Sequence, residues 1–343
     1  MKMLLNIKRC SIFRNMFRSQ YSAKDNALTE RPPSSAILGI DSEDRFADYV
    51  SKRATLNTSS PYDFTIQKSE SIMNGFFTRL AVSEVVFPWT VPNIHDLCEA
   101  VNISFGPPAG PFATALITIN QGFYTPSELA AAVQTQVQLS IPTFTMTYGT
   151  YNPAPGSVFP LPVFQYKTNA ATVISFQPLP VGDVVYGKTI APTTKQLFDV
   201  LGFRAVNSTF LTTGVSATTY AQSIRYIDIV CSQLTYNQSL KDTMSQQTSR
   251  DTLCRLYISN DTTPTNVDAS SPDFTPAGTV PFTIYRQFET PKYIQWIPNQ
   301  PVGGSLRFEV FDDTGRSLTD YTTAGIVIPT GTDWSMTLLV SEN

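Results

Sequence analysis

Arg79-Leu80-Ala81-Val82-Ser83-Glu84-Val85-Val86-Phe87-Pro88-Trp89 is the stretch that decides the fold. In an extended conformation it places apolar side chains on both faces, with Leu80, Val82 and Val86 on one and Ala81, Val85 and Phe87 on the other. This pattern predicts a central strand with a packed layer on each face. We expect the strand to stop at Pro88, because proline has no N–H for the hydrogen-bond ladder.

The composition favours short strands and turns over helices. The 343 residues include 25 prolines, 22 phenylalanines and 15 tyrosines, and only 15% of them are charged. The chain exceeds the roughly 250–300 residues at which one hydrophobic core stops growing. We therefore expect one large domain with an inserted lobe, or two domains.

Turn signals predict further strands around the central one. A strand over residues 62–67, followed by Asn74-Gly75, predicts a hairpin with the central strand. Another strand is expected over residues 100–105, where a Gly- and Pro-rich loop begins. Residues 36–105 are thus expected to form the first part of a β-sandwich.

The pattern changes between residues 106 and 221. Thr125-Pro126-Ser127-Glu128 has the residues of a capping box, with proline at the first helical position. Leu129, Val133 and Val137 give the following helix one apolar stripe. A second short helix is expected before Gly202, and short strands fill the rest. This segment is predicted to be an α+β insertion domain.

Strands return over residues 222–343. We expect them over residues 224–232, 253–259, 282–288, 293–297, 305–311 and 333–340. The strands at 305–311 and 333–340 alternate apolar and polar side chains, so each has one wet face. Together with the earlier strands they number about eight or nine, which predicts a mainly β fold, a single jelly-roll β-sandwich with an α+β insertion domain.

Residues 1–35 are expected to form a basic, extended or disordered N-terminal arm. The first 24 residues contain no acidic residue and six basic ones, Lys2, Lys8, Arg9, Arg14, Arg18 and Lys24. The net charge of the whole chain is −3, so the remainder carries −9. The arm is a candidate contact to nucleic acid or to an acidic inner surface, and six phosphate contacts would give a log–log salt slope of about −5. A solvated tail and a mitochondrial transit peptide are the alternatives.

The sequence predicts neither export nor a membrane span. No run approaches the roughly 18 apolar residues that a span requires, and the apolar start is too short for a signal peptide. Four cysteines without paired spacing suit a reducing compartment.

Gly182-Asp183-Val184-Val185-Tyr186-Gly187-Lys188-Thr189 matches the phosphate-binding loop pattern G-x-x-x-x-G-K-[ST]. Such a site needs a strand before the loop and a helix that begins at the lysine. Pro178 and Pro180 interrupt the first, and Pro192 interrupts the second. We expect a surface turn here, and no cofactor.

Asp313-Thr314-Gly315 spells the active-site triplet of aspartic proteases. That chemistry needs two carboxylates that share a proton, and the chain has one such triplet. A hairpin turn favours the same residues.

The single histidine, His95, lies between prolines with Asp96 beside it and Cys98 nearby. A lone loop imidazole is expected to be solvated, and too few ligands cluster around it for a metal site. No credible catalytic set remains, so we expect a protein that is not an enzyme. Glu84 on the central strand is expected to lie near a sheet edge or to be paired.

Several segments resemble the penton (minor capsid) proteins of virophages and polinton-like viruses. In chain order they are residues 41–45 (Asp-Ser-Glu-Asp-Arg), 61–66, 82–89, 122–129, 201–203, 226–232 and 334–342. Each segment is short, and the resemblance rests on their order over most of residues 36–342.

The resemblance implies a structural virion protein, a homopentamer that closes the vertex of an icosahedral double-stranded DNA virus capsid beside a major capsid protein with two jelly rolls. It places the protein in the virion, assembled in the infected host cell. The basic arm would face inward, toward shell proteins, an internal membrane or the genome. The insertion would face outward, where it is a candidate contact to a host-surface receptor.

Two alternatives remain open. One is a trimeric minor capsid or fibre-base protein from the same setting. The other is a carbohydrate-binding β-sandwich, whose site would need exposed Trp or Tyr near carboxylates.

Overall fold

The computed structural model describes residues 35–46, 48, 50–52, 59–67, 77–151, 161–185, 188–192, 194–203, 210–216, 223–236, 242–243, 249–250, 252–258, 282–296, 304–323, 326–327 and 332–342. Among the helices within these ranges, none is long and apolar enough to cross a membrane.

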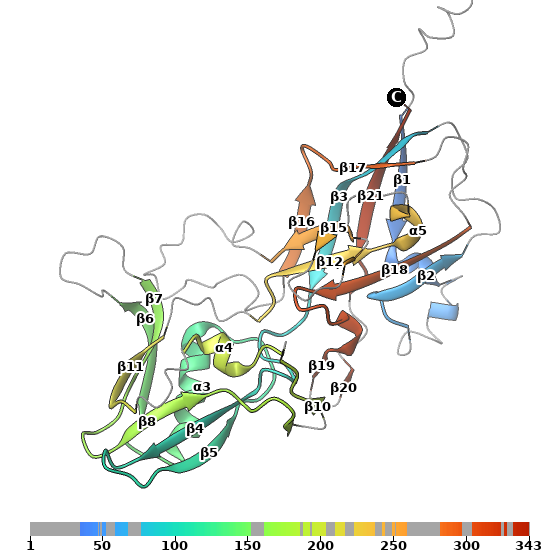
Figure 1. Cartoon of the computed structure of the whole chain (residues 1–343). Coiled ribbons are helices and arrows are strands. Elements are labelled where there is room, and N and C mark those ends of the chain that lie inside the picture. Colours follow the sequence, from blue (N-terminus) through green and yellow to red (C-terminus); the bar gives the residue numbers. More distant parts are fainter. Residues whose placement is uncertain are drawn as a thin grey trace, which may run out of the picture.

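Two antiparallel sheets form a β-sandwich (Figure 1). The first sheet has the order β1 (Ser35–Asp41), β21 (Ser335–Ser341), β3 (Arg79–Trp89) and β16 (Phe282–Gln287), and β17 (Tyr293–Gln295) also pairs β3. The second has the order β15 (Thr252–Tyr257), β12 (Tyr226–Val230), β18 (Ser305–Asp312) and β2 (Asp63–Gln67). Without β17, the eight sandwich strands follow one another in the chain as β1, β2, β3, β12, β15, β16, β18 and β21. If they are numbered 1 to 8 in that order, the first sheet has the strand order 1-8-3-6 and the second has the order 2-7-4-5. This is the strand order of a jelly roll, so the predicted fold class is confirmed.

The sandwich core lies between the inner faces of these sheets and is rich in aromatic residues. Trp334 packs edge-on against Phe64 and Phe308, with ring centroids 5.7 and 6.1 Å away. The predicted alternation in β18 and β21 is confirmed, because Leu306, Phe308 and Val310 and then Met336, Leu338 and Val340 are all buried.

The prediction that the two apolar sets of β3 lie on opposite faces is corrected, because β3 contains a β-bulge, although Ala81 on the outer face is fully buried. Thr337 of β21 pairs with Glu84 while the next residue, Leu338, pairs with Val82, so Ser83 is the extra residue. One inserted residue exchanges the two faces of a strand. The core side chains are therefore Leu80 and Val82 before the bulge, and Val85, Phe87 and Trp89 after it.

Two further expectations about β3 are corrected. The strand runs past Pro88 to Trp89, since β21 pairs β3 only as far as Val86 and Pro88 has a partner on one side alone, in β16. The expected hairpin with residues 62–67 does not form either. β2 pairs β18 in the second sheet, because consecutive strands at this point of a jelly roll belong to opposite sheets.

Residues 42–45 clamp the end of β1 to the start of its neighbour β21. The Ser42 hydroxyl donates to Asp333 and accepts from the Trp334 N–H, 3.0 and 2.9 Å away. Arg45, whose side chain is almost fully buried, pairs with the same Asp333 carboxylate. The segments 41–45 and 334–342 are thus neighbours in space although they lie at opposite ends of the described chain.

The chain leaves the sandwich after β3 and returns before β12, and between them it builds a second unit. This unit contains the sheet β5 (Ala113–Thr118), β4 (Ala100–Gly106), β8 (Val173–Gln177) and the sheet β11 (Thr213–Val215), β7 (Leu161–Lys167), β6 (Thr145–Tyr151). Two helices, α3 (Pro126–Gln138) and α4 (Leu197–Leu201), pack with them around a separate core. Figure 1 shows these elements grouped beside the sandwich.

Both predicted helices are present. Thr125 and Glu128 form the capping box of α3, and its apolar stripe of Leu129, Val133 and Val137 is fully buried. Gly202 ends α4 in the left-handed conformation at φ 72°.

The strand expected at 100–105 belongs to this second unit and not to the sandwich. As β4 it pairs β5 and β8, and its Val101 and Ile103 join the second core. We therefore propose that the insertion begins after Val91, the last residue of this segment in the sandwich core, rather than at residue 106.

The remaining described elements are short. They are the 3₁₀ turns η1 (Ser42–Arg45) and η3 (Leu318–Asp320), the helix α5 (Ser232–Thr235), and the strand pairs β9 (Val184–Val185) with β10 (Lys188–Thr189), β13 (Asp242–Thr243) with β14 (Ser249–Arg250), and β19 (Thr322–Thr323) with β20 (Ile326–Val327).

Candidate functional site

The turn after β18 carries the most densely bonded polar groups of the junction between the sandwich and the insertion. Asp312, only 1% exposed, accepts at Oδ1 from the N–H groups of Thr314 and Arg316, each 2.8 Å away. Its Oδ2 accepts from the Tyr321 hydroxyl. These bonds close the turn, so Asp313-Thr314-Gly315 is a tight turn as expected.

Asp313 connects this turn to the insertion. Its Oδ2 accepts from Lys195 Nζ at 2.5 Å and from Arg225 Nε at 2.8 Å, while its Oδ1 is buried without a hydrogen-bond partner among the described residues. Lys195 precedes α4 in the insertion, and Arg225 precedes β12 in the sandwich. The carboxylate is completely buried, so both cations offset its desolvation.

Arg316 makes a second link across the junction. Its guanidinium donates two hydrogen bonds to Asp96, at 3.2 and 3.0 Å, and lies over the Tyr321 ring at 4.1 Å. Asp96 belongs to the segment between β3 and β4, so one side chain ties the sandwich turn to the start of the insertion. Paired forks of this kind hold a fixed geometry.

The expectation that His95 is solvated is wrong. The residue is 3% exposed, and its ring meets Tyr321 edge-on with the centroids 4.7 Å apart. Its Nδ1 lies 3.3 Å from the Leu97 N–H and 3.3 Å from Asp96 Oδ1. Burial lowers the pKa of His95 below its usual value, and the hydrogen bond with Asp96 opposes this only in part.

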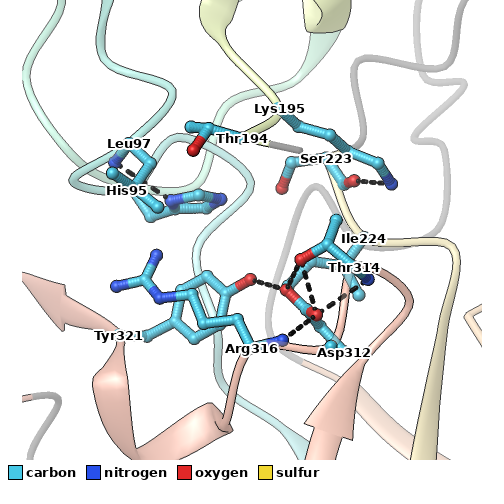
Figure 2. A pocket seen from close by; sticks show the side chains of 11 residues that line it. His95, Leu97, Thr194, Lys195, Ser223, Ile224, Asp312, Thr314, Arg316 and Tyr321 are labelled. Carbon is cyan, nitrogen blue, oxygen red and sulfur yellow. Dashed lines mark hydrogen bonds between the residues drawn. The ribbon is translucent and has the colours of Figure 1, made fainter. Parts of the chain in front are cut away.

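These groups surround a cavity of about 260 Å³ at the crossing points between the two units. Figure 2 shows the His95 ring, Thr194 and Ser223 above the turn that carries Asp312 and Thr314. The chain contributes to the cavity from four separate segments, since the linker after β3, the residues before α4, those before β12 and the turn after β18 all line it. This cavity is the candidate site in the described part of the chain that joins both units.

The other sequence candidates lie elsewhere. The six basic residues of the arm, Lys2, Lys8, Arg9, Arg14, Arg18 and Lys24, are outside the described residues. In the loop resembling a phosphate site, β9 and β10 pair as a small antiparallel hairpin, and no helix begins at Lys188. This pairing fits the expected surface turn, and residues 186 and 187 between the two strands lie outside the described residues.

Glu84 lies inside the first sheet, between β21 and β16, and not near an edge. It accepts from the Thr337 hydroxyl at 3.3 Å and the Tyr285 hydroxyl at 3.4 Å. Glu84 is therefore paired, with hydroxyl groups of the two neighbouring strands.

Cys98 lies next to His95 but has no character of a nucleophile. Burial raises its pKa to about 12, and its thiol donates to the Asn93 carbonyl at 3.2 Å. Within the described ranges, no group of three or more His, Cys, Asp or Glu side chains is arranged to hold a metal ion.

Sequence reasoning missed Lys195, Arg225 and Arg316 as parts of one cluster. They lie far apart in the chain, and none belongs to a recognisable motif. The adjacent pair Asp312-Asp313, read as a turn, was the one available signal, since two neighbouring carboxylates at the end of a buried strand need cations or donors nearby.

Comparisons with known proteins find distant structural likenesses. No protein-family model matches the chain, and no curated protein matches it. Among solved structures, the mavirus penton protein is similar at 10% identity and a TM-score of 0.49, over 90% of this chain and 99% of that one. A chain of the Sputnik virophage structure is similar at 10% identity and a TM-score of 0.41, over 90% of this chain and 98% of that one.

Proposed function

We propose that this chain is a structural protein of an icosahedral virus capsid, and that five copies close a vertex beside a major capsid protein. The observation that carries the proposal is the jelly-roll strand order with a separately folded insertion between the third and fourth strands. The segments that resemble penton proteins in sequence supply much of this architecture, since residues 41–45, 61–66, 82–89 and 334–342 meet around Trp334.

A ring needs two different contact surfaces on each subunit, because its interface is heterologous. The outer faces of the two sheets differ in this way. On the first sheet, Ile37, Leu339, Ala81 and Tyr293 form one apolar row across four strands. Ile37 is 72% exposed and Tyr293 is 45% exposed.

The outer face of the second sheet is charged instead. Arg307 forms a fork with Asp63, with bonds of 3.0 and 2.9 Å, and Arg255 forms another with Asp228. Because these charges are already paired within the sheet, this face is suited to a polar contact and not to an apolar one. We assign the apolar row on the first sheet to the contact with a second copy of this chain.

The carbohydrate-binding alternative is weakened by the position of the tryptophans. Trp89, Trp296 and Trp334 all belong to the sandwich core and are at most 7% exposed. None of them is available to stack on a sugar.

The first experiment is a mass measurement by light scattering on a sizing column. We expect a species near five times 37.9 kDa. A species of three subunits would favour the trimeric alternative, and a monomer that stays monomeric with major capsid protein present would contradict the vertex role.

The variant Ile37→Asp tests the assigned surface. A buried charge in the row should abolish the five-subunit species while the fold is kept. The matched control is Leu139→Asp at the end of α3, which is 80% exposed and lies in the insertion. Equal masses for both variants would contradict the assignment of the row.

The role of the basic arm is a separate proposal, that it faces the inside of the particle. Deletion of residues 1–24 should lower particle yield but leave the isolated fold intact. A full-length variant with the six basic residues changed to Gln separates charge from length. An unchanged yield in both would contradict an assembly role for the arm.

A further inference from the structure

We propose that the junction cavity binds a small carboxylate, carried either by a free metabolite-sized molecule or by an acidic side chain of another protein. The proposal does not depend on the capsid role. It rests on a balance of hydrogen-bond donors and acceptors around the cavity.

The Asp312 carboxylate, which lines the cavity floor, is already used as an acceptor, and the one open carboxylate oxygen nearby among the described residues, Asp313 Oδ1, belongs to a residue that does not line the cavity. Asp312 accepts at Oδ1 from Thr314 N, Thr314 Oγ1 and Arg316 N, and at Oδ2 from Thr314 Oγ1 and Tyr321. A carboxylate offers about four acceptor sites. A ligand that needed to donate would therefore find little to accept its proton here.

Donors, in contrast, are left over. Lys195 uses two of its three protons, on Asp313 and on the Ser223 carbonyl at 2.6 Å. Arg316 uses three of its five, two on Asp96 and one on the Asp320 carbonyl. The His95 ring also lines the cavity, below Thr194 in Figure 2.

The hydroxyls of Thr194 and Ser223 add donors that adapt to a ligand. The Thr194 oxygen accepts from Ala191 N at 3.0 Å, which leaves its proton to turn toward the cavity. Because fixed and adaptable donors outnumber open acceptors, the site fits a group that only accepts, and an ionised carboxylate is such a group. The volume of about 260 Å³ corresponds to roughly nine waters at about 30 Å³ each, the size of a small molecule or one side chain.

Net charge does not drive this binding. Three cations near the cavity, Lys195, Arg225 and Arg316, are balanced by Asp96, Asp312 and Asp313. We therefore expect a dissociation constant for the carboxylate in the millimolar range. Hydrogen bonds, and not long-range electrostatic attraction, would select the ligand.

Nuclear magnetic resonance of the single histidine tests the proposal on the full-length chain. Protein labelled at histidine Cε1 gives one resonance from the chain's one imidazole, which lines the cavity. Titration with succinate should shift that resonance and saturate in the millimolar range. The neutral analogue succinamide should not produce a saturable shift.

The variant Lys195→Met should weaken succinate binding about tenfold, since one charge-assisted hydrogen bond is lost. The control Lys167→Met removes an exposed lysine from β7 and should leave binding unchanged. Tryptophan fluorescence confirms that each variant is folded. If Lys195→Met does not fold, Thr194→Val removes a cavity donor and serves in its place.

A capped tripeptide with a central glutamate distinguishes the two sources of the carboxylate. Tighter binding of the peptide than of succinate would indicate a partner protein, and the reverse would indicate a free ligand. No saturable shift with either probe, an equal response to succinamide, or unchanged binding in the cavity variant would overturn the proposal.

Discussion

Deletion of Ser83 is the sharpest test of how the first sheet is built. Without the extra residue, Glu84 and Val82 become neighbours and stay paired with the consecutive residues Thr337 and Leu338, so the ladder becomes regular. Leu80, Val82, Val85, Phe87 and Trp89 then alternate along the strand and all keep their place in the core. The deletion removes the bond from the Ser83 hydroxyl to the Thr337 carbonyl and the bond from the Phe288 N–H to the Ser83 carbonyl, so it should cost only about 2 kcal/mol.

A register slip that turned Leu80 and Val82 outward would instead cost about 3–6 kcal/mol, since the two side chains are 0% and 5% exposed. Such a loss would be a large part of the roughly 5–15 kcal/mol that stabilises a typical domain. The assay is urea unfolding followed by tryptophan fluorescence, which reports on the sandwich alone because all three tryptophans lie in its core. The matched control is Ser83→Ala. It removes the hydroxyl bond to the Thr337 carbonyl at 3.0 Å but keeps the bulge, and should cost about 1 kcal/mol. A deletion variant that loses about 3–6 kcal/mol more than this control would refute Ser83 as the extra residue of the bulge.

Three other outcomes are expected. Asp333→Ala should lower sandwich stability by about 2–3 kcal/mol in the same assay, since it leaves the buried Arg45 guanidinium without its carboxylate. A change below about 0.5 kcal/mol would contradict a stabilising role for the contacts of Asp333 with residues 42–45. Thr125→Ala should speed hydrogen exchange of the α3 amides by removing a cap worth about 1 kcal/mol. Bonds from Thr125 lower the pKa of Glu128, so the wild-type advantage is present above the ordinary glutamate pKa and is lost as the pH falls through the lowered value; equal protection in both proteins at neutral pH would argue against the capping box. Cys98, Cys231 and Cys254, whose pKa values burial raises to about 12, should react with Ellman's reagent only after denaturation, and rapid labelling of any of them in the native protein would contradict their burial.

The sequence indicated single residues of the candidate site but not that they lie together. Asp313 and His95 were both singled out, one as a turn residue and the other as a solvated imidazole. Their burial follows from the docking of two units, because each lies where the chain crosses between the sandwich and the insertion. Contacts such as Lys195 to Asp313 join residues more than a hundred positions apart, and no local pattern encodes them.

Sequence patterns predicted the structure correctly where it depends on neighbouring residues alone. The capping box before α3, the left-handed Gly202 and the alternation of β18 and β21 all formed as expected, because each depends on backbone chemistry or on one buried face. The composition alone already favoured strands over helices.

The tertiary structure decided which strands meet, since pairing depends on partners distant in the chain. It placed β2 opposite β3 instead of beside it, and it moved β4 from the sandwich to the insertion. The stretch 79–89 shows the reason in one strand. Its sequence specifies apolar side chains on both alternating sets, but only the register with β21 places a bulge at Ser83 and so directs both sets to a single core.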